Sequence, residues 1–156
     1  MRKRIVTAAS ADARPAASGW LALEPLVQVE VTSEESGFPV EAALEPGRAE
    51  GWRAAAPGVQ TIRLLFDAPT RLRRVWLRFH EDTIARTQEI VLRCAANNQR
   101  LREIVRQQWT FSPAGATAET EDYHVELEGV TTLELTIVPD ISGGSAHASL
   151  AEWRLG

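Results

Sequence analysis

The chain has 156 residues, a formal net charge of −4 and 44% hydrophobic residues, which suits a single domain with a sizeable core. Acidic and basic residues are interspersed, and an acidic chain without a basic patch is a poor partner for nucleic acid. No apolar run approaches the roughly 20 residues that cross a bilayer, and Met1-Arg2-Lys3-Arg4 does not lead into the apolar core of a secretory signal. We therefore expect a cytoplasmic protein that binds neither nucleic acid nor a membrane.

The first part of the chain predicts a leader followed by one domain. Residues 1–19 carry no hydrophobic periodicity and predict a flexible or irregular N-terminal leader. The stretch Trp20-Leu21-Ala22-Leu23 supplies apolar anchors that we expect to pack onto a single β-sandwich domain of residues 20–156. Val27, Val29 and Val31 alternate with polar residues, which predicts the first strand of that domain.

Residues 33–58 interrupt the alternation and are rich in glycine and proline. One helical turn is expected at residues 40–44. Connections of this length without regular structure are usually functional or disordered. The apolar side chains Phe38, Leu44 and Trp52 look buried, so we expect the segment to be ordered.

The remaining chain alternates apolar and polar residues and predicts seven more strands. They are centred on Ile62, Leu77, Val91, Val105, Val125, Leu135 and Leu150. A turn at Asp67-Ala-Pro-Thr separates the first two of them. Eight strands in this pattern predict an all-β protein, an antiparallel jelly-roll β-sandwich. Cys94 is in phase with the apolar positions of its strand and is expected to be an inert core residue.

The connections between strands differ in length in a way that points to one end of the sandwich. If consecutive strands are antiparallel, every second connection lies at the same end. The long connections at residues 33–58, 80–87, 109–120 and 139–147 would then share an end, while tight turns occupy the other. Sandwiches commonly use the end with the longer loops for recognition, so we expect a binding site there.

Five residues of these connections are candidate ligand-binding residues: Arg53, His80, Arg86, Trp109 and Phe111. An aromatic ring can cover the apolar face of a sugar, and planar polar groups can hydrogen-bond its hydroxyls. For Trp109 and Phe111, packing in the core is an equal alternative to ligand stacking. For His80 the alternative is a solvated residue on the outer face of its strand, and this is the favoured interpretation.

Three stretches of the sequence resemble a known family. They are Ser33–Glu35 with Pro39–Gly47 and Gly51-Trp52, Thr61–Phe66 with Leu72–Leu77, and Ala148-Ser149-Leu150-Ala151-Glu152-Trp153 near the end. Together they resemble the discoidin or coagulation-factor type C (F5/8 type C) domain, a galactose-binding-like fold shared with bacterial carbohydrate-binding modules. The resemblance implies an eight-stranded jelly roll, and it makes carbohydrate the first ligand class to consider.

The resemblance also raises the question of a structural calcium ion. Family members often hold one through an Asp-Gly turn, a Thr before the Trp and a Glu of the last strand. Here Glu45 stands where the Asp would be, Pro46 intervenes before Gly47, and only Glu152 fits well. Calcium needs six to eight oxygen ligands, so we expect no metal and no other cofactor.

The leading hypothesis is a non-catalytic module that binds a carbohydrate or a similar polyol through loops at one end. The two aromatic candidates would stack on the ligand, and the three polar candidates would hydrogen-bond it. The alternative is a cytoplasmic protein-interaction or self-association domain, in which an exposed Trp76 anchors a protein partner or a second copy. No Ser-His-Asp order, HExxH, phosphate loop or paired-cysteine motif is present, so an enzyme is not predicted.

Overall fold

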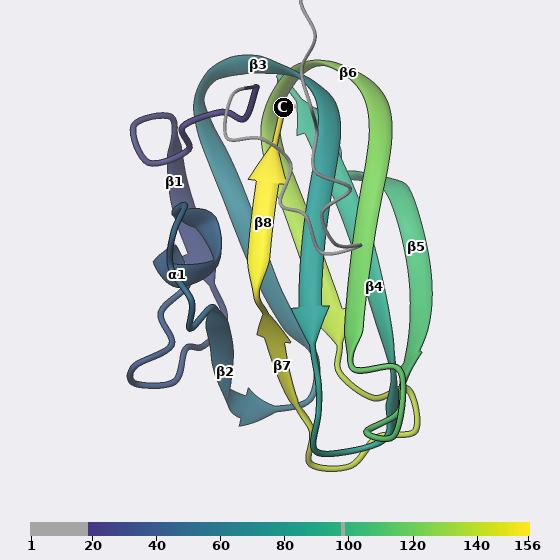
Figure 1. The fold of residues 1–156 in the computed structure, drawn as a ribbon. Coiled ribbons are helices and arrows are strands. Elements are labelled where there is room, and N and C mark those ends of the chain that lie inside the picture. The colour runs from purple at the N-terminus through teal and green to yellow at the C-terminus, as the bar shows by residue number, and fades with distance from the viewer. Residues whose placement is uncertain (1–18, 98) are drawn as a thin grey trace, which may run out of the picture.

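Alternating apolar residues build a β-sandwich in the computed structural model, which describes residues 19–97 and 99–156 (Figure 1). The predicted leader therefore lies outside the described residues, except for Gly19. The strands are β1 (Val27–Val31), β2 (Trp52–Pro57), β3 (Gln60–His80), β4 (Arg86–Ala96), β5 (Arg102–Phe111), β6 (Ala118–Val138), β7 (His147–Leu150) and β8 (Glu152–Leu155), with one short helix α1 (Glu41–Leu44). The prediction of an all-β antiparallel sandwich is confirmed.

Two long strands, β3 and β6, belong to both layers of the sandwich and arch over one end of it (Figure 1). The two strands stay paired with each other, but the neighbour on the other side of β3 changes from β1 along its first half to β8 along its second half. The first layer has the order β1-β3-β6-β4-β5, and in the second layer β8 pairs with the later half of β3. A separate two-stranded sheet, β2 and β7, continues the second layer toward the other end.

The bends in β3 and β6 correct the predicted division into strands. The sequence predicts a turn at residues 67–70, but pairing with β6 continues across it with register shifts between Leu65 and Arg74. Pro69 has no N–H to donate, and Gly129 in β6 adopts a φ of +64°, so both strands can bend without leaving each other. Each bend joins two predicted strands into one, because β3 and β6 stay paired with each other while both arch from one layer into the other.

The core fills the space between the layers. Ile62, Leu64, Leu133 and Leu135 from the first layer are fully buried, as is Trp153 from the second. Cys94 is buried with them, which confirms its expected place in the core.

The segment of residues 33–58 is ordered, and it contains both a predicted and an unpredicted element. The helical turn appears as α1, and Leu44 and Trp52 are buried as expected. Strand β2 was not predicted, because its Ala54-Ala55-Ala56 run lacks the β-branched and aromatic residues that indicate a strand. Gly51 allows the chain to enter β2 close to β7, because its φ is +65° and a Cβ there would lie 2.7 Å from the Leu150 carbonyl oxygen.

Trp76 corrects the expectation of an exposed aromatic anchor. It lies on the outer face of β3 but is only 4% exposed, since β6 and β8 flank this part of β3 on either side, with Asp122 and Arg154 in register. The neighbouring Arg74 stacks on Trp20, its guanidinium carbon 4.9 Å from the ring centre. An interaction surface centred on Trp76 is therefore not available in this structure.

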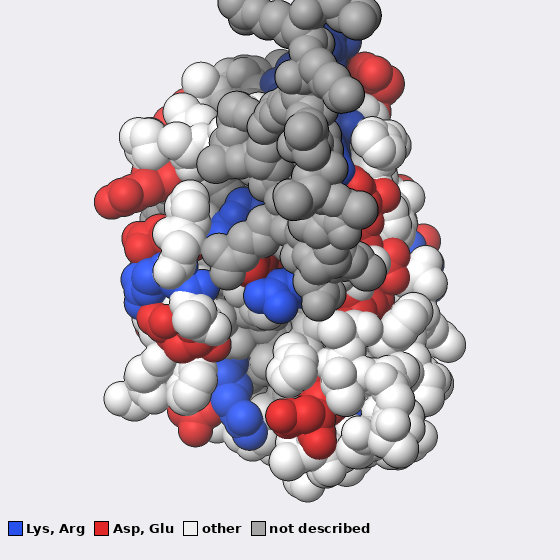
Figure 2. Space-filling view, in the orientation of Figure 1, with Lys and Arg blue, Asp and Glu red and all other residues white. Residues whose placement is uncertain are grey.

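The outer surface carries charges of both signs. On the face shown in Figure 2, the described residues present both basic and acidic side chains. Within residues 19–97 and 99–156, no helix is long and apolar enough to cross a membrane.

Candidate functional site

Three loops lie together at the end of the sandwich opposite the bends (Figure 1). They are the connections at residues 81–85, 112–117 and 139–146. Backbone hydrogen bonds join them: Glu81 N–H donates to Thr117 O over 2.8 Å, and Ile141 N–H donates to Thr87 O over 2.8 Å. Strict alternation of strand direction predicts that these connections share one end of the sandwich, and the three loops do lie together there.

A groove lies beside these loops, between β2, β3 and β7. It consists of two adjoining hollows of about 370 and 290 Å³, and three residues line both: Arg53, His80 and Ser149. We call it the loop-end groove. The first hollow is also lined by Phe38 and Arg78, and the second by residues 81–84 and 145–147.

The side chains of the loop-end groove offer hydrogen-bond donors and one exposed aromatic ring. Arg53 and His80 are each about half exposed; Arg53 pairs with Glu35 at 2.9 Å, and His80 Nε2 lies 3.6 Å from Asp82. Phe38 is 36% exposed at one end of the groove. A guanidinium, an imidazole and a hydroxyl beside an aromatic ring can bind a polyol or a carboxylate.

Two of the five predicted ligand residues, Arg86 and Phe111, lie in the interior instead. The Arg86 side chain is 1% exposed and stacks on the fully buried Phe111 ring, with 4.7 Å from its guanidinium carbon to the ring centre. The packing alternative stated above for Phe111 is therefore the one realised. The sequence places both residues at strand ends, but the pairing of β4 with β5 turns both toward the core.

Arg86 connects two of the loops. Its Nε donates to Glu81 Oε1 over 2.8 Å, and its Nη1 donates to the Pro139 carbonyl over 2.7 Å and to Gln88 Oε1 over 3.2 Å. One buried cation thus ties the connection at residues 81–85 to the connection at residues 139–146.

Glu81 stays ionised over the whole neutral range. Partial burial opposes its ionisation, but hydrogen bonds from Arg86 and Thr83 outweigh burial and lower the pKa of Glu81 to about 2. Because this pKa is depressed, the stability it contributes is complete above about pH 4.5 and is lost as the pH falls toward 2. The loop of residues 81–85 therefore stays anchored at neutral pH.

The pKa of Glu119 is shifted in the opposite direction from that of Glu81. It is 1% exposed on β6 and accepts a hydrogen bond from Gln88 Nε2 over 3.1 Å. Burial and then the neighbouring Glu121 raise the pKa of Glu119 to about 8, against the smaller opposing effects of Gln88 and Arg86. At neutral pH this carboxyl is protonated, and through Gln88 it joins the hydrogen bonds around Arg86.

Trp109 does not join Arg53 and His80. It is 37% exposed on the edge strand β5, opposite Gln88, and it lines neither hollow of the loop-end groove. Phe38, Arg78 and Ser149 also line the groove, and no pattern in the sequence singles them out as lining residues. The expectation that Phe38 is buried is wrong, because a lone aromatic residue in a segment rich in glycine and proline gives no indication of its exposure.

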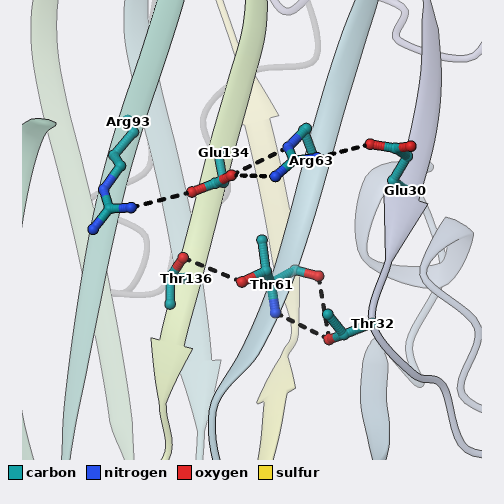
Figure 3. A network of polar contacts seen from close by, with 7 residues as sticks. All are labelled: Glu30, Thr32, Thr61, Arg63, Arg93, Glu134 and Thr136. Carbon is teal, nitrogen blue, oxygen red and sulfur yellow. Dashed lines mark hydrogen bonds and ion pairs between the residues drawn. The ribbon is translucent and has the colours of Figure 1, made fainter. Parts of the chain in front are cut away.

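Apart from the loop-end groove, a hollow lies on the outer face of the first layer, and the charged side chains that line it pair with one another (Figure 3). Arg63 bridges Glu30 at 3.1 Å and Glu134 at 2.7 Å, and Arg93 lies 3.7 Å from Glu134. These residues come from β1, β3, β6 and β4 in turn. Opposite charges on adjacent strands stabilise a sheet, so this network serves pairing between strands.

We expect Glu134→Gln to lower the free energy of unfolding by about 1–2 kcal/mol, because the carboxylate is nearly buried and serves two arginines. Urea denaturation measures the change. Glu30→Gln is the matched control, since Glu30 is half exposed and should change stability by less than about 0.5 kcal/mol. Equal effects of the two substitutions would contradict the central place of Glu134.

In the described part of the chain, no group of three or more His, Cys, Asp or Glu side chains could hold a metal ion. No family model and no curated protein matches the sequence. Solved structures do match it, and among them are carbohydrate-binding modules of family 32, which are discoidin-like, galactose-binding-like domains.

Three of these structures illustrate the likeness. The family 32 module of AlyQ, in complex with 4,5-unsaturated mannuronic acid, has a TM-score of 0.61 and 17% identity over 84% of this chain and 95% of that one. The module of Clostridium perfringens NanJ, in complex with galactose, has a TM-score of 0.58 and 14% identity over 83% and 92%. A pectin-binding module has a TM-score of 0.62 and 12% identity over 84% and 90%. At these identities the likeness establishes the fold.

Proposed function

We propose that the protein is a non-catalytic carbohydrate-binding module and that its ligand lies in the loop-end groove. The observation that carries the proposal is the position of Arg53 and His80, which come from different strands and line both hollows beside the exposed ring of Phe38. The likeness of the fold to carbohydrate-binding modules supports it.

The groove suits a saccharide for physical reasons. A sugar ring has an apolar face that packs on an aromatic side chain, and its hydroxyls accept and donate hydrogen bonds. Phe38 offers the aromatic ring for packing, and Arg53, His80 and Ser149 offer the hydrogen bonds. An open groove with few contacts gives weak binding, with a dissociation constant of roughly tens of micromolar to millimolar.

Two classes of saccharide follow from the chemistry of the groove. Neutral sugars such as galactose need hydroxyl recognition alone. Uronic acids add a carboxylate, which the guanidinium groups of Arg53 and Arg78 can pair with. One structural neighbour was solved with an unsaturated mannuronic acid and another is described as pectin-binding, which supports testing acidic saccharides beside galactose.

One of the carboxylates that line the groove, Glu81, suits a supporting role and not proton transfer. Glu81 is held ionised by Arg86 and Thr83, and its pKa of about 2 keeps it from carrying a proton at neutral pH. This agrees with a module that binds its ligand without chemical change.

The test is a glycan array that includes galactosides and uronic-acid oligosaccharides, followed by titration calorimetry with any ligand found. We expect Phe38→Ala and Arg53→Met each to weaken binding at least about tenfold, because each removes a contact with the ligand at an exposed position. Both variants should unfold at the wild-type temperature.

Trp109→Ala is the matched control, an exposed aromatic outside the loop-end groove. We expect it to leave the affinity unchanged. If Trp109→Ala abolished binding while Phe38→Ala did not, the ligand would lie beside Trp109, a stacking residue that the sequence predicts. A blank array would instead favour a protein partner.

A further inference from the structure

A buried arginine occupies the space between α1 and β8. Arg154 on β8 is 8% exposed and extends toward the end of α1. Its Nη1 donates to the carbonyl oxygens of Ala43 over 3.0 Å and of Trp153 over 2.9 Å. Its Nη2 donates to the Glu45 carbonyl over 3.2 Å and lies 3.4 Å from Glu152 Oε2. The guanidinium is thus surrounded by backbone carbonyls and a carboxylate.

These oxygens come from the segments where the family resemblance would place a structural calcium ion, so the fit of such an ion can be examined. Calcium needs six to eight oxygens at about 2.3–2.6 Å that face one common point. Here the carbonyl oxygens of Ala43 and Glu45 accept hydrogen bonds from Arg154.

The carboxylates of this region are also engaged by arginines. Glu152 Oε1 pairs with Arg78 at 2.8 Å, and its other oxygen faces Arg154. Arg48 pairs with the carboxylates of Glu45 at 3.0 Å and Glu50 at 2.7 Å. The residues present therefore do not fit a calcium ion, because arginine donors take the oxygens that the ion would need.

We propose that the guanidinium of Arg154 replaces a structural divalent cation in this protein and makes the fold independent of calcium. A guanidinium keeps its charge at every physiological pH, and its planar donors reach several acceptors at once. It can therefore join a helix end, the following loop and the last strand, as a bound metal ion does.

The bridge made by Arg154 also supports the loop-end groove, although the proposal does not depend on sugar binding. The loop that follows Glu45 contains Ala49 and Glu50, which line the first hollow. It then leads through Gly51 into β2, which carries Arg53. A cation built into the chain keeps this wall in place without a metal ion.

The test begins with thermal unfolding of the wild-type protein in excess EDTA and in millimolar calcium chloride. We expect the same midpoint in both, and no luminescence from added terbium, which is a calcium analogue that nearby tryptophans sensitise. A midpoint that rises with calcium or falls with EDTA would overturn the proposal.

Two substitutions then test Arg154 itself. Arg154→Met removes the donor to the Ala43 and Glu45 carbonyls and one of the two arginines at Glu152, so it should lower the midpoint by about 10 °C. Arg154→Lys keeps one charge but not the planar donors, so amide exchange over residues 41–50 should speed up at least about tenfold even where the fold is retained. Arg71→Met, which removes a half-exposed arginine on β3, is the matched control and should change neither readout. Unchanged exchange over residues 41–50 in Arg154→Lys, together with an unchanged midpoint in Arg154→Met, would contradict the bridging role.

Discussion

Arg86→Met is expected to lower the free energy of unfolding by about 3–5 kcal/mol and to loosen two loops at once. The substitution removes a cation whose side chain is almost completely buried, and it leaves Glu81 Oε1 and the Pro139 carbonyl without the arginine donor. The apolar methionine can still pack on Phe111, so the loss measures the polar contacts and not a cavity. Urea denaturation gives the stability change.

Hydrogen exchange shows whether Arg86 acts on both loops. Amides of residues 81–85 and 139–146 should exchange faster in Arg86→Met, whereas Glu81→Gln should affect only residues 81–85, because it leaves the bond to Pro139 intact. Arg106→Met is the control, an exposed arginine on β5 that pairs with Glu89 and Glu103. An identical exchange pattern in Arg86→Met and Arg106→Met would show that Arg86 does not join the loops.

Glu119→Gln should stabilise the protein at pH 9 and change it little at pH 5. In the wild type, the folded state keeps the proton of Glu119 up to about pH 8, whereas the unfolded state releases it near pH 4.5. The folded state therefore binds more protons between these values, and the wild-type stability should fall as the pH rises through this window. Glutamine accepts the same hydrogen bond from Gln88 and has no proton to lose.

The expected gain for Glu119→Gln at pH 9 is about 2–4 kcal/mol, and the slope of stability against pH should flatten between pH 5 and 8. Denaturation series at several pH values, each compared with the wild type, give both quantities. Glu126→Gln on the same strand is the matched control, since that carboxylate is exposed. A wild-type stability that does not fall between pH 5 and 8 would mean that Glu119 is ionised in the folded protein.

Local residue patterns were enough to predict the fold class. Strict alternation predicts strands wherever one face is buried, and its phase placed Cys94 in the core correctly. The division of the chain into strands was not predictable to the same degree. The residues of a tight turn and of a bend are the same, and only the continued pairing of β3 with β6 distinguishes the two at residues 67–70.

Local residue patterns predict the candidate site less well than they predict the strands. Arg53 and His80 were expected at one end of the sandwich, and the structure places both in the loop-end groove. Arg86 and Phe111 were expected there too, but their exposure depends on which face the pairing of β4 and β5 turns inward at the strand ends. No local pattern decides this, because strand ends have too few residues to establish a phase.

Alternation and turn residues act over a few neighbours, so the residue pattern alone was enough to predict the antiparallel sandwich and the end at which the long connections meet. Which polar residues face a groove and which support the interior depends on how the layers and loops pack together. Arg86 and Arg154 are ordinary arginines in the sequence, and their roles arise from carbonyl and carboxylate oxygens that come from distant segments. Burial and partners of this kind are properties of the folded chain, since they exist only when the layers and loops have come together.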